Sequence, residues 1–268
     1  MFSQYKQEVS KHTKKDALIA LIFFVYACAV AFASSLISTL PNMPLGDIAF
    51  TIISTLLVTG PLLCLIIFNK QGLSSIGMYK KNLWPALCIG LILSAVILLF
   101  NTILPWLLSD WSFRPIDQVM RFLFFAIMVS LYEDILFTGF IQTRIYGLIK
   151  NDVAAVLTTA ILFGLIHIPA HLVFSGVAGL SVIILLSMTF WIAKHCIWNM
   201  IFRRYFSLFP IMMTHIVWNF GNIGIFDHPG THGHWISAYN LYIFLFAVVI
   251  WLVISYRKIR KTSLEQTT

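Results

Sequence analysis

Two adjacent carboxylates, Glu133 and Asp134, lie in the middle of an apolar stretch long enough to cross a membrane. The other eight of the ten acidic residues lie near the chain ends, in predicted loops or at the edges of apolar segments. A charge at that depth costs roughly 2.5–3.5 kcal/mol on insertion scales, so an acid there is a functional-site hypothesis by default. The alternative is a pair neutralised by protonation or by hydrogen bonds between helices.

Three further polar side chains are predicted at similar depth in two other apolar segments: His167, His215 and Asn219. Counted from one membrane face, with a rise of 1.5 Å per residue, these three and Glu133 lie about 8 to 14 residues deep. Uncompensated polar groups are costly in hydrocarbon, so the helices should turn them toward one another. His215 and Asn219 are spaced i,i+4 and share a helix face.

These residue types suit hydrolysis. A desolvated carboxylate such as Glu133 is a better general base for water, and a neighbouring His167 can share the proton. A second imidazole with a carboxamide, His215 with Asn219, can donate hydrogen bonds to a developing oxyanion, a contribution of a few kcal/mol. No Ser or Cys stands out beside a base, so nucleophilic catalysis is less favoured.

A metal site is the alternative reading of the same side chains. Glu133, His167 and His215 could hold a zinc ion with one open position. However, the H-E-x-x-H pattern is absent from the sequence, and the Asn219 carboxamide is a poor zinc ligand. We therefore predict no metal and no other cofactor.

The composition predicts how these residues are held. The chain has 268 residues, of which 59% are hydrophobic and 10% charged, whereas soluble domains have about 25% charged residues. We expect an all-α, polytopic membrane protein with a single transmembrane domain over residues 1–268, because no polar stretch is long enough to fold separately. The formal net charge of +8 would suggest nucleic acid in a soluble protein, but here Lys and Arg fall between apolar segments and set the topology. The expected partners are the lipid bilayer and a substrate, with no nucleic acid.

About eight transmembrane helices are predicted. The expected spans are 17–40, 46–68, 83–108, 116–146, 153–174, 178–202, 208–226 and 239–256. An even number of spans puts both termini on one side, and all Lys and Arg residues except Arg114 and Arg121 fall on that side or at its edge. We assign it to the cytoplasm. The first apolar run is too long for a signal peptide and lacks a convincing cleavage site, so no cleavable signal is expected.

The polar residues also carry a family resemblance. The sequence has E-D-I-L-F-T-G from Glu133, F-G-L-I-H from Phe163 to His167, and H-I-V-W-N from His215 to Asn219. In order and spacing these resemble the E-E-x-x-x-R, F-x-x-x-H and H-x-x-x-N motifs of the CPBP family, the CAAX-protease and bacteriocin-processing intramembrane proteases. The resemblance covers a motif-bearing core of about 116–226.

The resemblance implies a glutamate-dependent intramembrane endopeptidase that cleaves a peptide or a prenylated protein. It implies that Glu133 activates water with His167 and that His215 and Asn219 bind the oxyanion, with Phe163 in a supporting role. It further implies a multi-pass protein of the bacterial plasma membrane, with a role in bacteriocin immunity or peptide maturation. The substrate, the host and the oligomeric state are not predicted.

Two positions depart from the family pattern. The second Glu is Asp134, and the Arg one turn later is Thr138. A Glu and an Arg at i,i+4 can form an ion pair, whereas Asp134 and Thr138 can make at most a hydrogen bond. A second interpretation is therefore a catalytically inactive relative that acts by binding. A proton-coupled transporter is a further alternative, although the first three spans lack a polar set that would match an inverted repeat.

A second His-x-x-Trp-Asn pattern precedes the one that ends at Asn219. It runs from His195 to Asn199, and Asn199 lies only about four residues from the expected cytoplasmic end of its span. We therefore place the functional copy at His215 and Asn219. The first copy is interpreted as an interfacial His and Trp belt, beside Lys194 with its amine extended to the membrane surface.

Overall fold

The computed structural model describes residues 2–38, 47–79, 83–107, 112–175 and 182–227. Its elements, in chain order, are α1 (Phe2–Val9), α2 (Lys14–Ser38), α3 (Asp47–Phe68), the 3-10 helix η1 (Leu73–Ile76), α4 (Leu83–Leu98), the π-helix η3 (Leu99–Ile103), α5 (Leu104–Leu107), β1 (Ser112–Phe113), α6 (Ile116–Glu133), the π-helix η4 (Asp134–Ile141), α7 (Gln142–Ile149), α8 (Asp152–Leu165), α9 (Ile168–Ser175), α10 (Val182–Tyr205), α11 (Phe209–Ile223) and β2 (Phe226–Asp227). The all-α class predicted from composition is confirmed.

Helices occupy seven of the eight predicted spans, and the eighth, 239–256, lies outside the described residues. Three of the described helical segments are long and apolar enough to cross a membrane: Lys14–Ile37, Thr51–Phe68 and Ile116–Ile149. Leu83–Leu98 and Asp152–Leu165 are shorter apolar helices. The number of spans and the cytoplasmic side of the termini stay predictions.

The long segment that carries Glu133 and Asp134 is helical without interruption from Ile116 to Ile149, but its middle is a π-helix. α6 ends at Glu133 and η4 begins at Asp134, so the winding of the helix changes between the two carboxylates. π-helical turns are rare and are frequently found at functional sites. Every residue of η4 is buried, because it lies at the centre of the bundle.

The fifth predicted span is wrong in one respect, because it is not a continuous helix. α8 ends at Leu165 and α9 begins at Ile168, which leaves His167 in the break between them. Pro169 explains the break, since it has no N–H to donate and its ring would clash with the carbonyl of Leu165 four residues earlier. His167 thus lies where two short helices meet.

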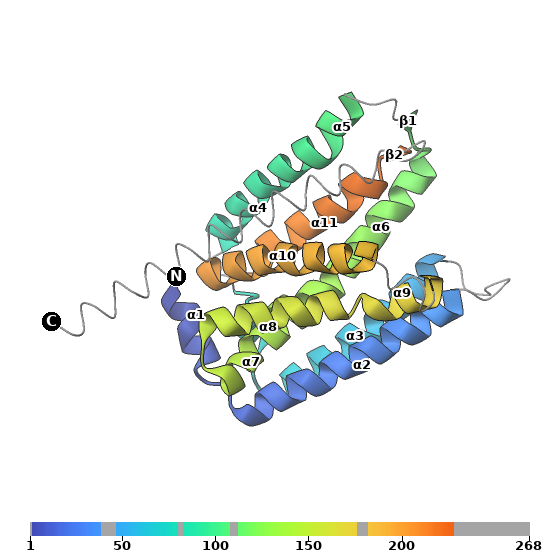
Figure 1. Cartoon of the computed structure of the whole chain (residues 1–268). Coiled ribbons are helices and arrows are strands. Elements are labelled where there is room, and N and C mark those ends of the chain that lie inside the picture. Colours follow the sequence, from blue (N-terminus) through green and yellow to red (C-terminus); the bar gives the residue numbers. More distant parts are fainter. Residues whose placement is uncertain (1, 39–46, 80–82, 108–111, 176–181, 228–268) are drawn as a thin grey trace.

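The two ends of the bundle are closed by short elements (Figure 1). At one end β1 and β2 pair antiparallel, with Phe113 opposite Phe226, and join the segments that precede α6 and follow α11. At the other end the amino-terminal residues form α1, whose Tyr5 is fully buried against Phe202 and Phe206 of the α10 end. Burial raises the pKa of the Tyr5 hydroxyl above its ordinary value. α1 therefore covers the end of α10.

The helices that carry the polar residues pack around α6 and η4. α11 packs on α4 and α6, α10 packs on α8, and α2 and α3 pack on the opposite side of the α6–η4–α7 segment. One close approach needs a glycine: a Cβ at Gly139 would lie 3.1 Å from atoms of both Ile76 and Leu208. The junction of α6 and η4, where Glu133 and Asp134 lie, is therefore enclosed by neighbouring helices.

Candidate active site

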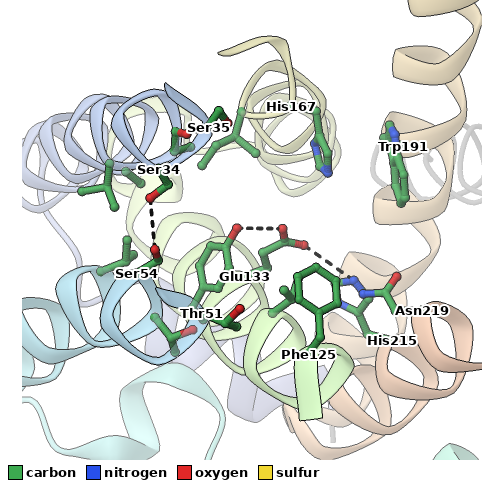
Figure 2. Close-up of a pocket in the computed structure, with 18 of the residues that line it drawn as sticks. Ser34, Ser35, Thr51, Ser54, Phe125, Glu133, His167, Trp191, His215 and Asn219 are labelled. Carbon is green, nitrogen blue, oxygen red and sulfur yellow. Dashed lines mark hydrogen bonds and ion pairs between the residues drawn. The ribbon is translucent and has the colours of Figure 1, made fainter. Parts of the chain in front are cut away.

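Glu133, His167, His215 and Asn219 line one pocket of about 570 Å³. They come from α6, the α8–α9 break and α11, and the remaining walls come mainly from α2, α3 and α6, with Trp191 from α10. In Figure 2, Ser34 and Ser54 lie on the other side of Glu133 from His215 and Asn219. The structure thus brings together the four residues that the sequence predicted in one layer.

The two carboxylates have different surroundings. Glu133 is 5% exposed and lines the pocket, and its Oε1 accepts a hydrogen bond of 3.0 Å from the Tyr132 hydroxyl. Asp134 is fully buried and does not line the pocket. The carboxylate available to a bound molecule is therefore that of Glu133.

His215 lies between the two acids. Its Nδ1 is 3.1 Å from Asp134 Oδ1, a hydrogen-bond distance. Its Nε2 is 3.6 Å from Glu133 Oε2, which is too long for a hydrogen bond but close enough for an ion pair (Figure 2). The Asp134 contact fixes the orientation of the ring, with its second nitrogen held toward Glu133.

His167 is held by its own helix. Its Nδ1 lies 2.8 Å from the Phe163 carbonyl oxygen, and because a carbonyl only accepts, Nδ1 carries the hydrogen of this bond. In the neutral ring Nε2 is then an acceptor. The ring also stacks on Trp191, with centroids 4.8 Å apart and planes within 8°. In Figure 2 it faces the pocket across from Glu133.

Phe163, the predicted supporting residue, is fully buried among the imidazoles. Its ring centroid lies 5.1 Å from that of His167 and 6.4 Å from that of His215. It stacks on His195 with centroids 4.1 Å apart and planes within 7°. Phe163 therefore packs against imidazole rings from the α8–α9 break, α10 and α11.

The interpretation of the first His-x-x-Trp-Asn copy as an interfacial belt is wrong. Lys194, His195 and Asn199 are all fully buried. α10 continues to Tyr205 rather than ending near Phe202, and α1 packs against its end, so these residues are deeper than the count from the predicted span end suggested. Lys194 does not reach the surface.

Asn199 contacts the position at which the sequence departs from the family pattern. The Thr138 hydroxyl donates a hydrogen bond of 3.3 Å to Asn199 Oδ1, and Gln142 Nε2 donates one of 3.1 Å to the Asn199 carbonyl oxygen. Thr138 is fully buried. The side chain that lies against position 138 is thus an amide of α10, not the Asp134 carboxylate expected at i,i+4.

Sequence reasoning missed three residues close to the site: Tyr132, Lys194 as a buried group, and Asn199. Tyr132 directly precedes the acid pair and gave no separate signal. A lysine eight residues before the expected end of an apolar span was a signal for Lys194, because a buried ammonium needs a counter-charge. The contact between Thr138 and Asn199 spans 61 positions and had no local signal.

A metal would need several donors directed at one point. Among the residues that the structure describes, no group of three or more His, Cys, Asp and Glu side chains has that arrangement. Nδ1 of each imidazole is used, on Asp134 and on the Phe163 carbonyl, which leaves Nε2 of both rings for contacts within the site. Because the described side chains do not form such a group, they fit proton transfer and hydrogen bonding better than they fit zinc.

The family model described as Type II CAAX prenyl endopeptidase Rce1-like matches residues 115–221. Over these residues the chain is Rce1-like. The match confirms the resemblance to the CPBP intramembrane proteases, and the Rce1-like segment contains all four pocket residues Glu133, His167, His215 and Asn219. Together with the three long apolar helices, the match points to an integral membrane protein that is similar, over this segment, to a protease family. No curated protein and no solved structure matches the chain.

Proposed function

We propose that this protein is an intramembrane endopeptidase that hydrolyses a peptide bond with a water molecule activated by Glu133. The observation that carries the proposal is the position of Glu133, which lines the pocket while His215 lies between it and Asp134. The Rce1-like match supports the reaction class. The tyrosine hydrogen bond to Glu133 Oε1 leaves Oε2 for the water.

In the proposed first step, the water donates one hydrogen bond to Glu133 and the other to Nε2 of His167. Its oxygen attacks the carbonyl carbon of the scissile bond, and Glu133 takes the proton. The carbonyl oxygen becomes an oxyanion that accepts hydrogen bonds from the Asn219 amide and from Nε2 of His215. Because Nδ1 of His215 donates to Asp134, this step needs the doubly protonated ring, with Asp134 and Glu133 as its counter-charges. Preorganised donors of this kind contribute typically a few kcal/mol.

In the second step, the tetrahedral intermediate collapses. The carbon–nitrogen bond breaks and the leaving nitrogen takes the proton that Glu133 received, so the carboxylate is regenerated. Asp134 takes no proton in this scheme; it accepts from His215 Nδ1 and holds the ring in place. His167 is held in the acceptor form by the Phe163 carbonyl.

The pocket supports an uncharged peptide segment as the substrate. Among the described residues that line it, Glu133 is the acid and none is Lys or Arg; the opposite wall carries hydroxyl groups of Ser34 and Ser54, 3.1 Å apart. Hydroxyls can pair with the backbone of an extended peptide that enters from the membrane. A peptide or prenylated protein fits this lining, and a role in bacteriocin immunity or peptide maturation in a bacterial plasma membrane is the proposed context.

The test is cleavage of a fluorogenic peptide library, with and without a prenylated cysteine, by protein reconstituted in lipid vesicles. Glu133→Gln is expected to lower kcat by about 10²-fold or more, because general-base catalysis contributes 10²- to 10⁴-fold. Glu8→Gln, which makes the same chemical change in α1, is the matched control and should retain activity. Equal rates for wild type and Glu133→Gln would remove the proposal.

A further inference from the structure

Lys194 is a fully buried lysine in the middle of α10. Its Nζ has no hydrogen-bond partner among the described residues. A charged ammonium taken out of water without a partner is costly, so a lysine kept at such a position needs compensation from its surroundings. The surrounding residues compensate for the buried charge in two ways.

The first form is an aromatic cage. Nζ lies 3.9 Å from the ring centroid of Trp191, 4.4 Å from Trp198, 5.5 Å from Trp218 and 5.9 Å from Phe163. The faces of aromatic rings carry negative electrostatic potential, and tryptophan is the best cation–π partner. Four rings around one Nζ favour a charged ammonium over a neutral amine.

The second form is opposite charge. Within the described part of the chain, the ionisable groups whose charges oppose that of Lys194 are Glu133 and Asp134. The positive charge of Lys194 in turn interacts electrostatically with both carboxylates and with the nearby His215. Two carboxylates at one buried site repel each other, and a cation favours their charged forms.

The cage also connects Lys194 to the site by contact. Trp191 stacks on His167, and Trp198 packs on His215 with ring centroids 4.3 Å apart. Trp218 lies three residues after His215 on α11 and lines the pocket. The rings that hold the ammonium are therefore the rings that hold the two imidazoles.

α10, the helix that carries Lys194, also contacts Thr138, the position at which the family motif has an arginine. Asn199 of α10 accepts the hydrogen bond of Thr138, so α10 faces the acid-bearing segment at that turn. Thr138 has no charge to balance the acids, and Lys194 lies on α10 five residues before Asn199.

We infer that Lys194, held by Trp191, Trp198 and Trp218, is a positioning residue that supplies the positive charge for the Glu133–Asp134 pair in place of an arginine at position 138. It does not touch the substrate; it acts through the acids, keeping Glu133 in the charged form that accepts a proton from water. This catalytic consequence rests on the proposed function, whereas the charge balance itself does not.

The experiment titrates the carboxyl groups by infrared difference spectroscopy and measures cleavage against pH on the same samples. The carbonyl band of protonated Glu133 is identified as the one that Glu133→Gln removes. Lys194→Met keeps the length and removes the charge, Lys194→Arg keeps the charge, and Lys150→Met is a matched control on a lysine that lies over Tyr146 in an exposed position.

In Lys194→Met we expect the titration midpoint of the Glu133 band to rise by about one pH unit or more, the range typical of a nearby opposite charge. The acid limb of the pH–rate profile should move in the same direction. Lys194→Arg should restore both toward wild type, and Lys150→Met should change neither. A midpoint that is the same in wild type and Lys194→Met would overturn the inference.

The two proposals fail in different ways. Cleavage that depends on Glu133 together with an unmoved midpoint would overturn the role of Lys194 and leave the protease proposal standing. A shifted midpoint in a protein that cleaves no peptide would overturn the protease proposal and leave the charge-balancing role of Lys194 standing. If Lys194→Met does not fold, Asp134→Asn in the same chain should recover folding by restoring charge balance; no recovery would show that the lysine acts only by its shape.

Discussion

His215 and Asp134 form a buried pair 81 positions apart, with Nδ1 3.1 Å from Oδ1. The pair explains why both carboxylates occur in the same helix although only Glu133 lines the pocket. One acid faces the bound molecule and the other orients the imidazole beside it. Both acids contact one imidazole ring at the point where the α-helix changes to a π-helix.

Asp134→Asn should therefore reduce activity without abolishing it. The amide can still contact His215 but accepts its hydrogen bond less strongly, and comparable orienting residues at metal-bound imidazoles contribute about 10- to 100-fold. We expect a loss of that size in kcat, smaller than that of Glu133→Gln. The reverse ranking of the two variants would identify Asp134 as the general base.

Removal of divalent metals should leave cleavage unchanged. The two imidazoles are held by Asp134 and by the Phe163 carbonyl, in orientations that suit proton transfer. The measurement is the cleavage rate after dialysis against a zinc chelator at neutral pH. If the rate falls and returns on addition of zinc, Glu133, His167 and His215 are metal ligands instead.

Thr138→Arg should lower the yield of folded protein. Thr138 is fully buried and bonded to Asn199, so the structure leaves no space for the larger side chain at that turn. Thr138→Val, of nearly the same shape, should cost only about 1–3 kcal/mol from the acceptor left unpaired on Asn199. Thermal unfolding of the purified variants measures both effects. A Thr138→Arg protein as stable as wild type would show that position 138 still accommodates the motif arginine.

The stability of the protein should fall as the pH drops from about 6.5 to about 4. Burial, reinforced by the positive charge of Arg144, lowers the pKa of His12 from 6.5 to about 4, although Glu8 lies 3.7 Å away. The folded state therefore holds a neutral His12 while the unfolded state binds a proton in that range. This stabilisation, of the order of 3 kcal/mol, is complete above pH 6.5 and is lost progressively as the pH falls from 6.5 to about 4.

The measurement is the unfolding temperature against pH for wild type and His12→Gln, which cannot titrate at that position. The variant should show the smaller decrease between pH 6.5 and 4. Parallel curves for the two proteins would mean that the pKa of His12 is the same in the folded and unfolded states.

The orientation in the membrane can be checked with single cysteines in a chain whose four native cysteines are replaced. A cysteine at Gly230 should react with a membrane-impermeant maleimide added outside whole cells, and one at Asn82 should react only after the cells are broken. The distribution of Lys and Arg is the reason for this expectation. The opposite pattern would invert the topology and the depth count that placed the polar residues in one layer.

Residue types and their positions in apolar stretches were enough to predict which residues could do chemistry and at what depth. Charges in hydrocarbon are so costly that a mid-span Glu133 stands out, and the i,i+4 spacing of His215 and Asn219 puts them on one helix face. Hydropathy located the helices because about 20 apolar residues are needed to cross a bilayer. The break at His167 was also present in the sequence, in Pro169, but the span was extended through it.

Which polar groups meet depends on how the helices pack, and the sequence did not predict it. Depth says nothing about the rotation of a helix about its axis, and that rotation is set by packing between segments far apart in the chain. His215 therefore joined Asp134 as well as Glu133, and Asn199 joined Thr138, through contacts over 81 and 61 positions. The burial of Lys194 depended on the length of α10, on α1 at its end and on three tryptophans from two helices. No local pattern encodes a cage assembled from such separate segments.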